Sequence, residues 1–131
     1  PAPPVLQGAK PAPQAQWTQA VTPDSTRLFR YSAVTFNGHR IHYDDRYVRE
    51  VEGYPGLVVH GPMIATLMVQ AFTRAHPDLA VRSLAYRGLR PLISPRAFQV
   101  GGRLQDGQAA QLWAEQDGML AHQADITFAR S

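Results

Sequence analysis

The chain of 131 residues contains no cysteine and only one lysine. Without cysteine there are no disulfide bonds, no thiolate metal sites and no thiol nucleophile. The absence also fits a reducing compartment, so we expect a cytoplasmic protein. No apolar run is long enough to span a bilayer, because His60, Thr66 and Gln70 interrupt the most apolar stretch. The first residues also lack the apolar core of a signal peptide, so we expect no membrane partner.

Arginine supplies nearly all of the positive charge. Lysine and arginine together number 13, only Lys10 is a lysine, and the formal net charge is +3. The arginines are scattered, without a basic run interleaved with aromatic residues, so nucleic acid is not an expected partner. Arginines gathered at a cleft would suit the phosphates of a small carrier molecule, because guanidinium groups bind phosphate through two hydrogen bonds. For any single arginine, an exposed place on a strand is the simpler reading.

Proline is concentrated at the start of the chain, where six of the 11 prolines fall within the first 23 residues. Residues 1–16 read PAPPVLQGAKPAPQAQ and carry too little apolar surface to offset the entropy of ordering them. We therefore predict an arm or linker over residues 1–24 and a single domain over residues 25–131. The chain starts with Pro1 rather than methionine, so either the initiator is removed or the chain is part of a longer protein.

The first half of the predicted domain mixes strand and helix signals. Loose alternation predicts a first strand over residues 27–34, and Gly38 makes residues 36–43 irregular. Asp44 or Asp45 can cap a short helix over residues 46–51. Gly61 and Pro62 then begin a helix that runs to residue 75 and is apolar on nearly every face.

The second half predicts four strands, over residues 81–90, 96–105, 108–115 and 119–129. Asp106-Gly107 and Asp117-Gly118 are dipeptides that supply positive φ in two-residue hairpin loops. A helix this apolar needs partners on several sides. We therefore predict an α+β domain with the hot-dog fold, in which an antiparallel sheet of about five strands wraps around a central helix.

Two segments together suggest a site. Residues 31–44 place His39 and His42 near the amide of Asn37, and residues 58–72 open the apolar helix at Gly61. A histidine can move protons near neutral pH. The free N–H groups at the start of a helix can stabilise an oxyanion.

Three motifs resemble the C-terminal half of MaoC-like hydratases and dehydratases. They are FNGHRIHYD at residues 36–44, EGYPGLVVHGP at 52–62 and YRGLRPL at 86–92. The chain is similar in particular to the subgroup of mesaconyl-CoA and itaconyl-CoA hydratases and type-two hydroxyacyl-thioester dehydratases, over about residues 27–128. The resemblance implies a hydro-lyase of the hot-dog fold. Its substrate would be an acyl thioester of coenzyme A or acyl carrier protein, with no separate cofactor.

The family pattern is Asp, any residue, Asn, Pro, an aliphatic residue, His. His42 and Ile41 match its last two positions, whereas Asn37, His39 and Arg40 stand at the positions of aspartate, asparagine and proline. The resemblance therefore makes His42 the acid–base residue. Asn37 would orient water or bind the thioester oxygen, and the backbone N–H of Gly61 would be the oxyanion donor.

Five further residues are predicted to contact substrate, and each has a simpler reading. They are His39, Arg40, His60, Arg87 and Arg90. The histidines can equally be loop or packing residues, and the arginines can be surface charges. The simpler reading of His42 is a structural residue that hydrogen-bonds a backbone carbonyl. Asp44 is predicted as a helix cap. His39 and His42 have the spacing of a metal pair, but no third ligand is evident, so we expect no metal.

Two other functions remain open. A single hot-dog unit can be a noncatalytic subunit or half of an enzyme that pairs with a second hot-dog chain, and fold alone does not decide function. An acyl-CoA thioesterase is less favoured, because no carboxylate lies near the start of the helix. In every case we expect a homodimer or a pair with another hot-dog chain, because an isolated sheet leaves an unpaired edge.

Overall fold

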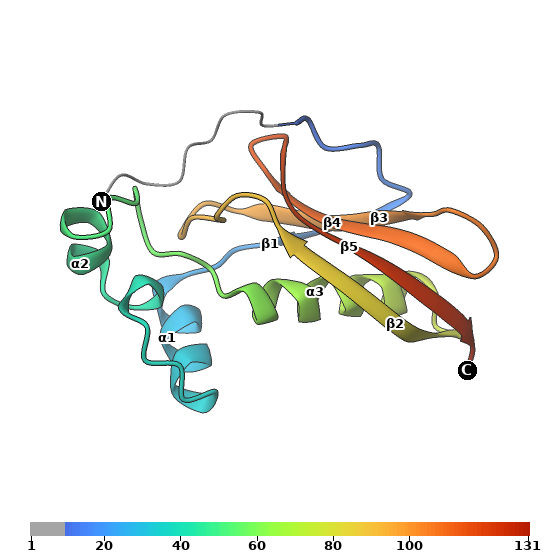
Figure 1. The fold of residues 1–131 in the computed structure, drawn as a ribbon, viewed down its shortest axis with the longest axis horizontal. Helices are drawn as coiled ribbons and strands as arrows, with labels where there is room; N and C mark the ends of the chain where they lie inside the picture. The colour runs from blue at the N-terminus through green and yellow to red at the C-terminus, as the bar shows by residue number, and fades with distance from the viewer. Residues whose placement is uncertain (1–9) are drawn as a thin grey trace.

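A central helix packed against a five-stranded sheet organises the domain (Figure 1). The computed structural model describes residues 10–131. Neighbouring strands are antiparallel and follow the order β1-β3-β4-β5-β2. The strands are β1 (Trp17–Val21), β2 (Leu79–Gly88), β3 (Phe98–Leu104), β4 (Ala109–Gln116) and β5 (Met119–Arg130). The helical elements are α1 (Ser25–Val34), the 3-10 turn η1 (Arg40–His42), α2 (Asp45–Glu50) and α3 (Gly61–Ala75).

Helix α3 forms the middle of the core. It starts at Gly61 with Pro62 in its first turn, and it packs on β1, β2, β3 and β4. Figure 1 shows it lying lengthwise against one face of the sheet. Its buried residues are Met63, Ile64, Leu67, Met68, Ala71 and Phe72, while a thin stripe through Thr66 and Gln70 stays exposed. Within residues 10–131, no helix is long and apolar enough to cross a membrane. The hot-dog arrangement expected from the apolar helix is confirmed.

The four C-terminal strands follow the prediction to within about two residues at each end. The turn between β4 and β5 is of the predicted kind, with φ of 56° at Asp117 and 78° at Gly118. The turn between β3 and β4 is not, because neither Asp106 nor Gly107 has positive φ. Instead, the Asp106 carboxylate accepts hydrogen bonds from the backbone N–H groups of Gln108 at 2.7 Å and Ala109 at 2.8 Å. A side chain therefore closes that turn.

Residues 27–34, predicted as the first strand, belong to helix α1, so that prediction is wrong. Asp24 is the N-cap, and its carboxylate accepts a hydrogen bond from the Arg27 N–H at 2.8 Å. The buried residues Leu28 and Ser32 lie four positions apart, which is one turn of a helix. The capping aspartate and this spacing outweigh the loose alternation that favoured a strand.

The fifth strand lies in the segment predicted as an arm. Strand β1 pairs with β3 along its whole length, from Trp17 opposite Gly102 to Val21 opposite Phe98. Residues before it also follow the sheet, since the Lys10 carbonyl accepts a hydrogen bond from the Leu120 N–H at 2.8 Å. The sheet thus begins before residue 25, the predicted start of the domain. Residues 1–9 of the predicted arm lie outside the described residues.

We expect Gly102→Ala to destabilise the protein by about 1–3 kcal/mol, the usual range for overpacking. A Cβ at Gly102 would lie 2.5 Å from Cζ2 of Trp17 and 2.6 Å from the Gln111 carbonyl oxygen. Urea unfolding followed by tryptophan fluorescence measures the change. The control is Gly107→Ala, where a Cβ meets nothing within 4 Å and the change should stay within about 0.5 kcal/mol. Equal stability of the two variants would contradict the close packing of β1 on β3.

Candidate active site

His42 is held in a single neutral tautomer by the backbone. Its ring lies at the end of η1, is 8% exposed, and places Nδ1 2.6 Å from the Val58 carbonyl oxygen. A carbonyl can only accept, so Nδ1 carries the hydrogen and Nε2 of the neutral ring carries a free lone pair. The Val58 N–H in turn donates to the Ile41 carbonyl at 2.8 Å. These two bonds fix η1 against the segment that leads into α3.

His60 lies directly under His42. The two ring centroids are 3.8 Å apart and the planes are inclined by 19°. His60 is 0% exposed, and its Nε2 lies 2.7 Å from the Ser32 hydroxyl of α1. The Tyr31 ring meets His60 edge-on at 4.7 Å. Although His60 occupies the N-cap position of α3, its side chain makes no capping hydrogen bond. Its contacts therefore connect α1 to the start of α3.

Burial keeps both stacked histidines neutral. Desolvation lowers the pKa of His42 below 6.5; the bond to Val58 works in the opposite direction, and the nearby His39 lowers the pKa further. Burial also lowers the pKa of His60, to about 4, and repulsion from His42 adds to the effect. Two imidazolium rings this close would repel each other strongly. At neutral pH, His42 can therefore accept a proton at Nε2.

Asn37 and His39 lie in the loop before η1. The Asn37 side-chain oxygen accepts a hydrogen bond from the His39 N–H at 3.1 Å, and the Asn37 N–H donates to the Ser32 carbonyl at 2.8 Å. The oxygen of the Asn37 amide is thus occupied by the loop, so its NH₂ group is the end left for a ligand. The exposed His39 ring lies edge-on to His42 at 5.8 Å.

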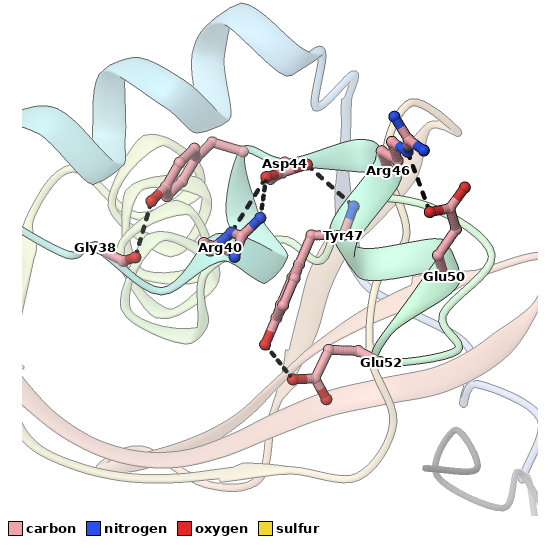
Figure 2. Close-up of polar contacts among 8 residues, drawn as sticks. Gly38, Arg40, Asp44, Arg46, Tyr47, Glu50 and Glu52 are labelled. Atoms are coloured by element: carbon pink, nitrogen blue, oxygen red, sulfur yellow. Dashed lines mark hydrogen bonds and ion pairs between the residues drawn. The ribbon is translucent and has the colours of Figure 1, made fainter.

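Arg40 contacts two nearby residues of its own segment. It bonds the Asp44 carboxylate at 2.9 Å, and its guanidinium lies 4.1 Å from the centroid of the Tyr47 ring. Figure 2 shows this pair together with the bond from the Tyr47 N–H to Asp44. That bond caps α2, so the prediction of Asp44 as a cap is confirmed. The contacts of Arg40 are those of a surface residue that braces η1 against α2.

Arg87 and Arg90 lie at and just beyond the end of β2. Successive residues of a strand point to opposite faces. Because Tyr86 reaches α3, the exposed Arg87 points away from the helix. Arg90 continues past the strand, and its N–H donates to the Ala121 carbonyl at 3.0 Å. The predicted role of Arg40, Arg87 and Arg90 in binding phosphate stays a prediction.

Gly61 adjoins Tyr86, which is bonded to His122, a buried histidine that was not predicted from the sequence. A Cβ on Gly61 would lie 3.2 Å from the Tyr86 hydroxyl, which is hydrogen-bonded to Nδ1 of His122 on β5. His122 is 8% exposed, and burial lowers its pKa to about 4. The alternation of β5 was the available signal, since His122 shares a face with Ala124 and Ile126.

Two open grooves flank α1. One, of about 330 Å³, runs between α1 and α3 and is lined by Tyr31, Leu67, Gln70 and their neighbours. The other, of about 430 Å³, lies beside the loop after α1 and is lined by Ser32, Asn37, Tyr43 and the exposed Phe36. Tyr31 and Ser32 both touch His60. Both grooves therefore reach residues that contact the stacked histidines. Over residues 10–131, no three His, Asp or Glu side chains gather to hold a metal ion.

Comparison with known proteins agrees with this fold and shows the family of the chain. The family of hydroxyacyl-thioester dehydratase type 2 matches residues 3–94, and the chain belongs to that family. It is 42% identical over 110 residues to mesaconyl-C(4)-CoA hydratase of Chloroflexus aurantiacus, covering 83% of this chain and 39% of the relative. It is 32% identical over 109 residues to the mitochondrial hydroxyacyl-thioester dehydratase type 2 of Schizosaccharomyces pombe, covering 82% of this chain and 34% of the relative.

A solved structure described as a MaoC-like dehydratase aligns over all of this chain and 43% of its own, with a TM-score of 0.78 and 19% identity. That likeness concerns the fold, and it agrees with the hot-dog arrangement. This chain spans less than half of the length of each of the three proteins. The family predicted from the three motifs is confirmed.

We expect stability to fall as the pH drops from about 6.5 towards 4. Over this range the histidines of the unfolded chain bind protons, whereas the buried His60 and His122 of the folded chain stay neutral, because burial lowers the pKa of each to about 4. Each histidine therefore contributes a slope of up to about 1.4 kcal/mol per pH unit, and above pH 6.5 their contribution to stability is complete. Urea unfolding at a series of pH values measures the slope.

His60→Gln should reduce this slope, because the amide can keep the bond to Ser32 but does not titrate. The control is His76→Gln at the other end of α3, which leaves both buried histidines in place. A pH dependence unchanged by His60→Gln would contradict a buried, neutral His60.

Proposed function

We propose that the chain hydrates α,β-unsaturated acyl thioesters and, in reverse, dehydrates 3-hydroxyacyl thioesters. The observation that carries the proposal is the unprotonated Nε2 of buried His42, held by the bond from Nδ1 to the Val58 carbonyl. The start of α3 lies one residue beyond His60, on which His42 stacks. A base and a set of helix N–H groups at one place suit a reaction that takes a proton from water and develops charge on an oxygen.

In the hydration direction, Nε2 of His42 takes a proton from water while the water oxygen bonds to the β-carbon. The π electrons of the double bond shift to form a new double bond between the α-carbon and the carbonyl carbon, and the carbonyl π electrons move onto the thioester oxygen, which gives an enolate. The N–H of Gly61 stabilises this oxygen, aided by the positive end of the α3 dipole. The imidazolium of His42 then returns its proton to the α-carbon, so the site ends as it began.

Asn37 is proposed to position the water or the thioester through its NH₂ group, because its oxygen is bonded to the loop. It cannot be the base, since an amide does not accept a proton at neutral pH. His39 is proposed to bind substrate, and Arg40, Arg87 and Arg90 are proposed to bind the phosphates of the carrier. His60 is proposed to act through His42, since it is enclosed and bonded to Ser32. The carrier is coenzyme A or acyl carrier protein.

A thioesterase is less well supported. Hydrolysis of this kind needs a group that directs water to the thioester carbonyl, and none of the described contacts of His42 or His60 involves a carboxylate. Release of a free thiol from the substrate would nevertheless reveal it. The two activities are therefore distinguished in the same assay.

We expect His42→Gln to lower the rate of hydration by about 10²- to 10⁴-fold, the usual contribution of a general base. Loss of the enoyl absorbance of crotonyl-, mesaconyl- and itaconyl-CoA measures the rate. The matched control is His76→Gln, which removes a histidine whose Nδ1 also lies by a backbone carbonyl, that of Phe72 at 3.2 Å. Full activity of His42→Gln, or thiol release by the wild-type chain without hydration, would overturn the proposal.

We also propose that a second hot-dog unit, either another copy or a different chain, pairs with this one. The chain spans 39% and 34% of its two relatives, which leaves room in them for another unit. Strand β2 lies at an edge of the sheet, and its middle residues, including Leu84, are exposed. An edge strand ten residues long offers unpaired N–H and C=O groups to a partner.

If the second unit is another copy, sedimentation of the purified chain should give a mass near twice 14.5 kDa. Leu84→Lys should shift the population towards the monomer, because lysine on an edge strand opposes pairing. The control is Leu104→Lys, an equally exposed leucine at the end of the inner strand β3. A wild-type chain that sediments as a monomer and still hydrates thioesters would contradict the need for a second unit.

A further inference from the structure

The Tyr86 hydroxyl lies beside the first residue of α3. A Cβ added to Gly61 would stand 3.2 Å from this oxygen and 3.8 Å from the ring carbon that bears it. Because Gly61 has no side chain, nothing of its own separates its backbone from the hydroxyl. In Figure 1 the C-terminal end of β2 likewise reaches the start of α3. The phenol thus lies at the residue whose N–H is the proposed oxyanion donor.

His122 decides which way this hydroxyl can donate. Its Nδ1 is bonded to Tyr86, whereas its Nε2 is buried and has no partner among the described residues. A buried N–H without an acceptor is rarer in proteins than an acceptor without a donor. The favoured tautomer therefore places the hydrogen on Nδ1, which donates to the Tyr86 oxygen. The O–H of Tyr86 is then free to donate elsewhere.

The sheet holds the pair in place. Tyr86 and Gly88 share one face of β2, and Gly88 is paired with His122 across the ladder. A Cβ on Gly88 would lie 3.2 Å from Cε1 of His122, so the missing side chain lets the imidazole lie flat on the strand. The Tyr86 and His122 rings are nearly parallel, with centroids 5.7 Å apart. Burial raises the pKa of Tyr86, so the phenol keeps its proton at neutral pH.

We propose that Tyr86 is a second oxyanion donor, which bonds the same thioester oxygen as the Gly61 N–H, and that His122 is the positioning residue for its hydroxyl. This inference rests on the proposed hydration of thioesters and adds a catalytic residue to it. No proton leaves Tyr86 in the reaction. The phenol only strengthens its hydrogen bond as charge grows on the oxygen.

The first test is Tyr86→Phe, which removes the hydroxyl and keeps the ring. We expect kcat for hydration to fall by about 10²- to 10³-fold with little change in KM, because the lost bond is strongest in the transition state. The matched control is Tyr47→Phe on α2, which removes a hydroxyl that donates a hydrogen bond to Glu52 at 2.9 Å (Figure 2). Wild-type kcat in Tyr86→Phe would overturn the inference and leave the proposed function standing.

The second test observes the bond without turnover. Butyryl-CoA labelled with ¹³C at the thioester carbonyl has no double bond to hydrate, so it can be held in the site for infrared spectroscopy. Binding to the wild-type chain should lower the carbonyl stretching frequency, and Tyr86→Phe should lose part of that shift while Tyr47→Phe keeps all of it. The same shift in wild type and Tyr86→Phe would show that the phenol does not touch this oxygen.

His122 is tested by a pair of substitutions. His122→Leu removes the donor to the phenol, and we expect both kcat and the infrared shift to fall part of the way towards the values of Tyr86→Phe. His122→Gln can still donate an N–H and should restore most of both, provided that circular dichroism shows each variant to be folded. Wild-type values in a folded His122→Leu would overturn the positioning role. Absence of hydration by the wild-type chain would instead count against the proposed function itself.

Discussion

The hydrogen bond from His42 to the Val58 carbonyl is the contact on which the candidate site depends. It joins the three-residue turn η1 to the segment that leads into the buried helix α3. The same bond decides where the proton of the neutral ring resides. One interaction thus sets both the place and the chemical state of the proposed base. Its acceptor is a main-chain atom, so its geometry follows from the fold around α3.

Burial supplies the second constraint, and it acts on three histidines in the same direction. His42, His60 and His122 are all removed from water, and desolvation is the main cause of the lowered pKa of each. Rings kept neutral in this way can accept or donate single hydrogen bonds in fixed directions. His60, which precedes Gly61, and His122, which is bonded to Tyr86, therefore act as oriented dipoles at neutral pH. This arrangement suits a site in which charge appears on the substrate.

The sequence predicted much of this because its strongest patterns are local. The apolar helix from Gly61, the short helix capped by Asp44 and the Asp117-Gly118 turn all follow from neighbouring residues. The errors came where a weak pattern competed with a single cap. Loose alternation favoured a strand at residues 27–34, while Asp24 and the spacing of Leu28 and Ser32 specify a helix. Contacts between distant segments, such as Tyr86 with His122 or His60 with Ser32, leave no local signal.

The contacts of His60 also depend on the length of helix α1. Tyr31 and Ser32 reach His60 only because the residues after Asp24 turn through the required number of helical steps. One residue inserted between Asp24 and Ser32 would rotate the end of α1 by about 100° relative to its cap. The hydroxyl would then face away from the imidazole, and a different residue would lie against the stacked rings. The number of residues in α1, as well as their identity, is therefore part of the specification of the site.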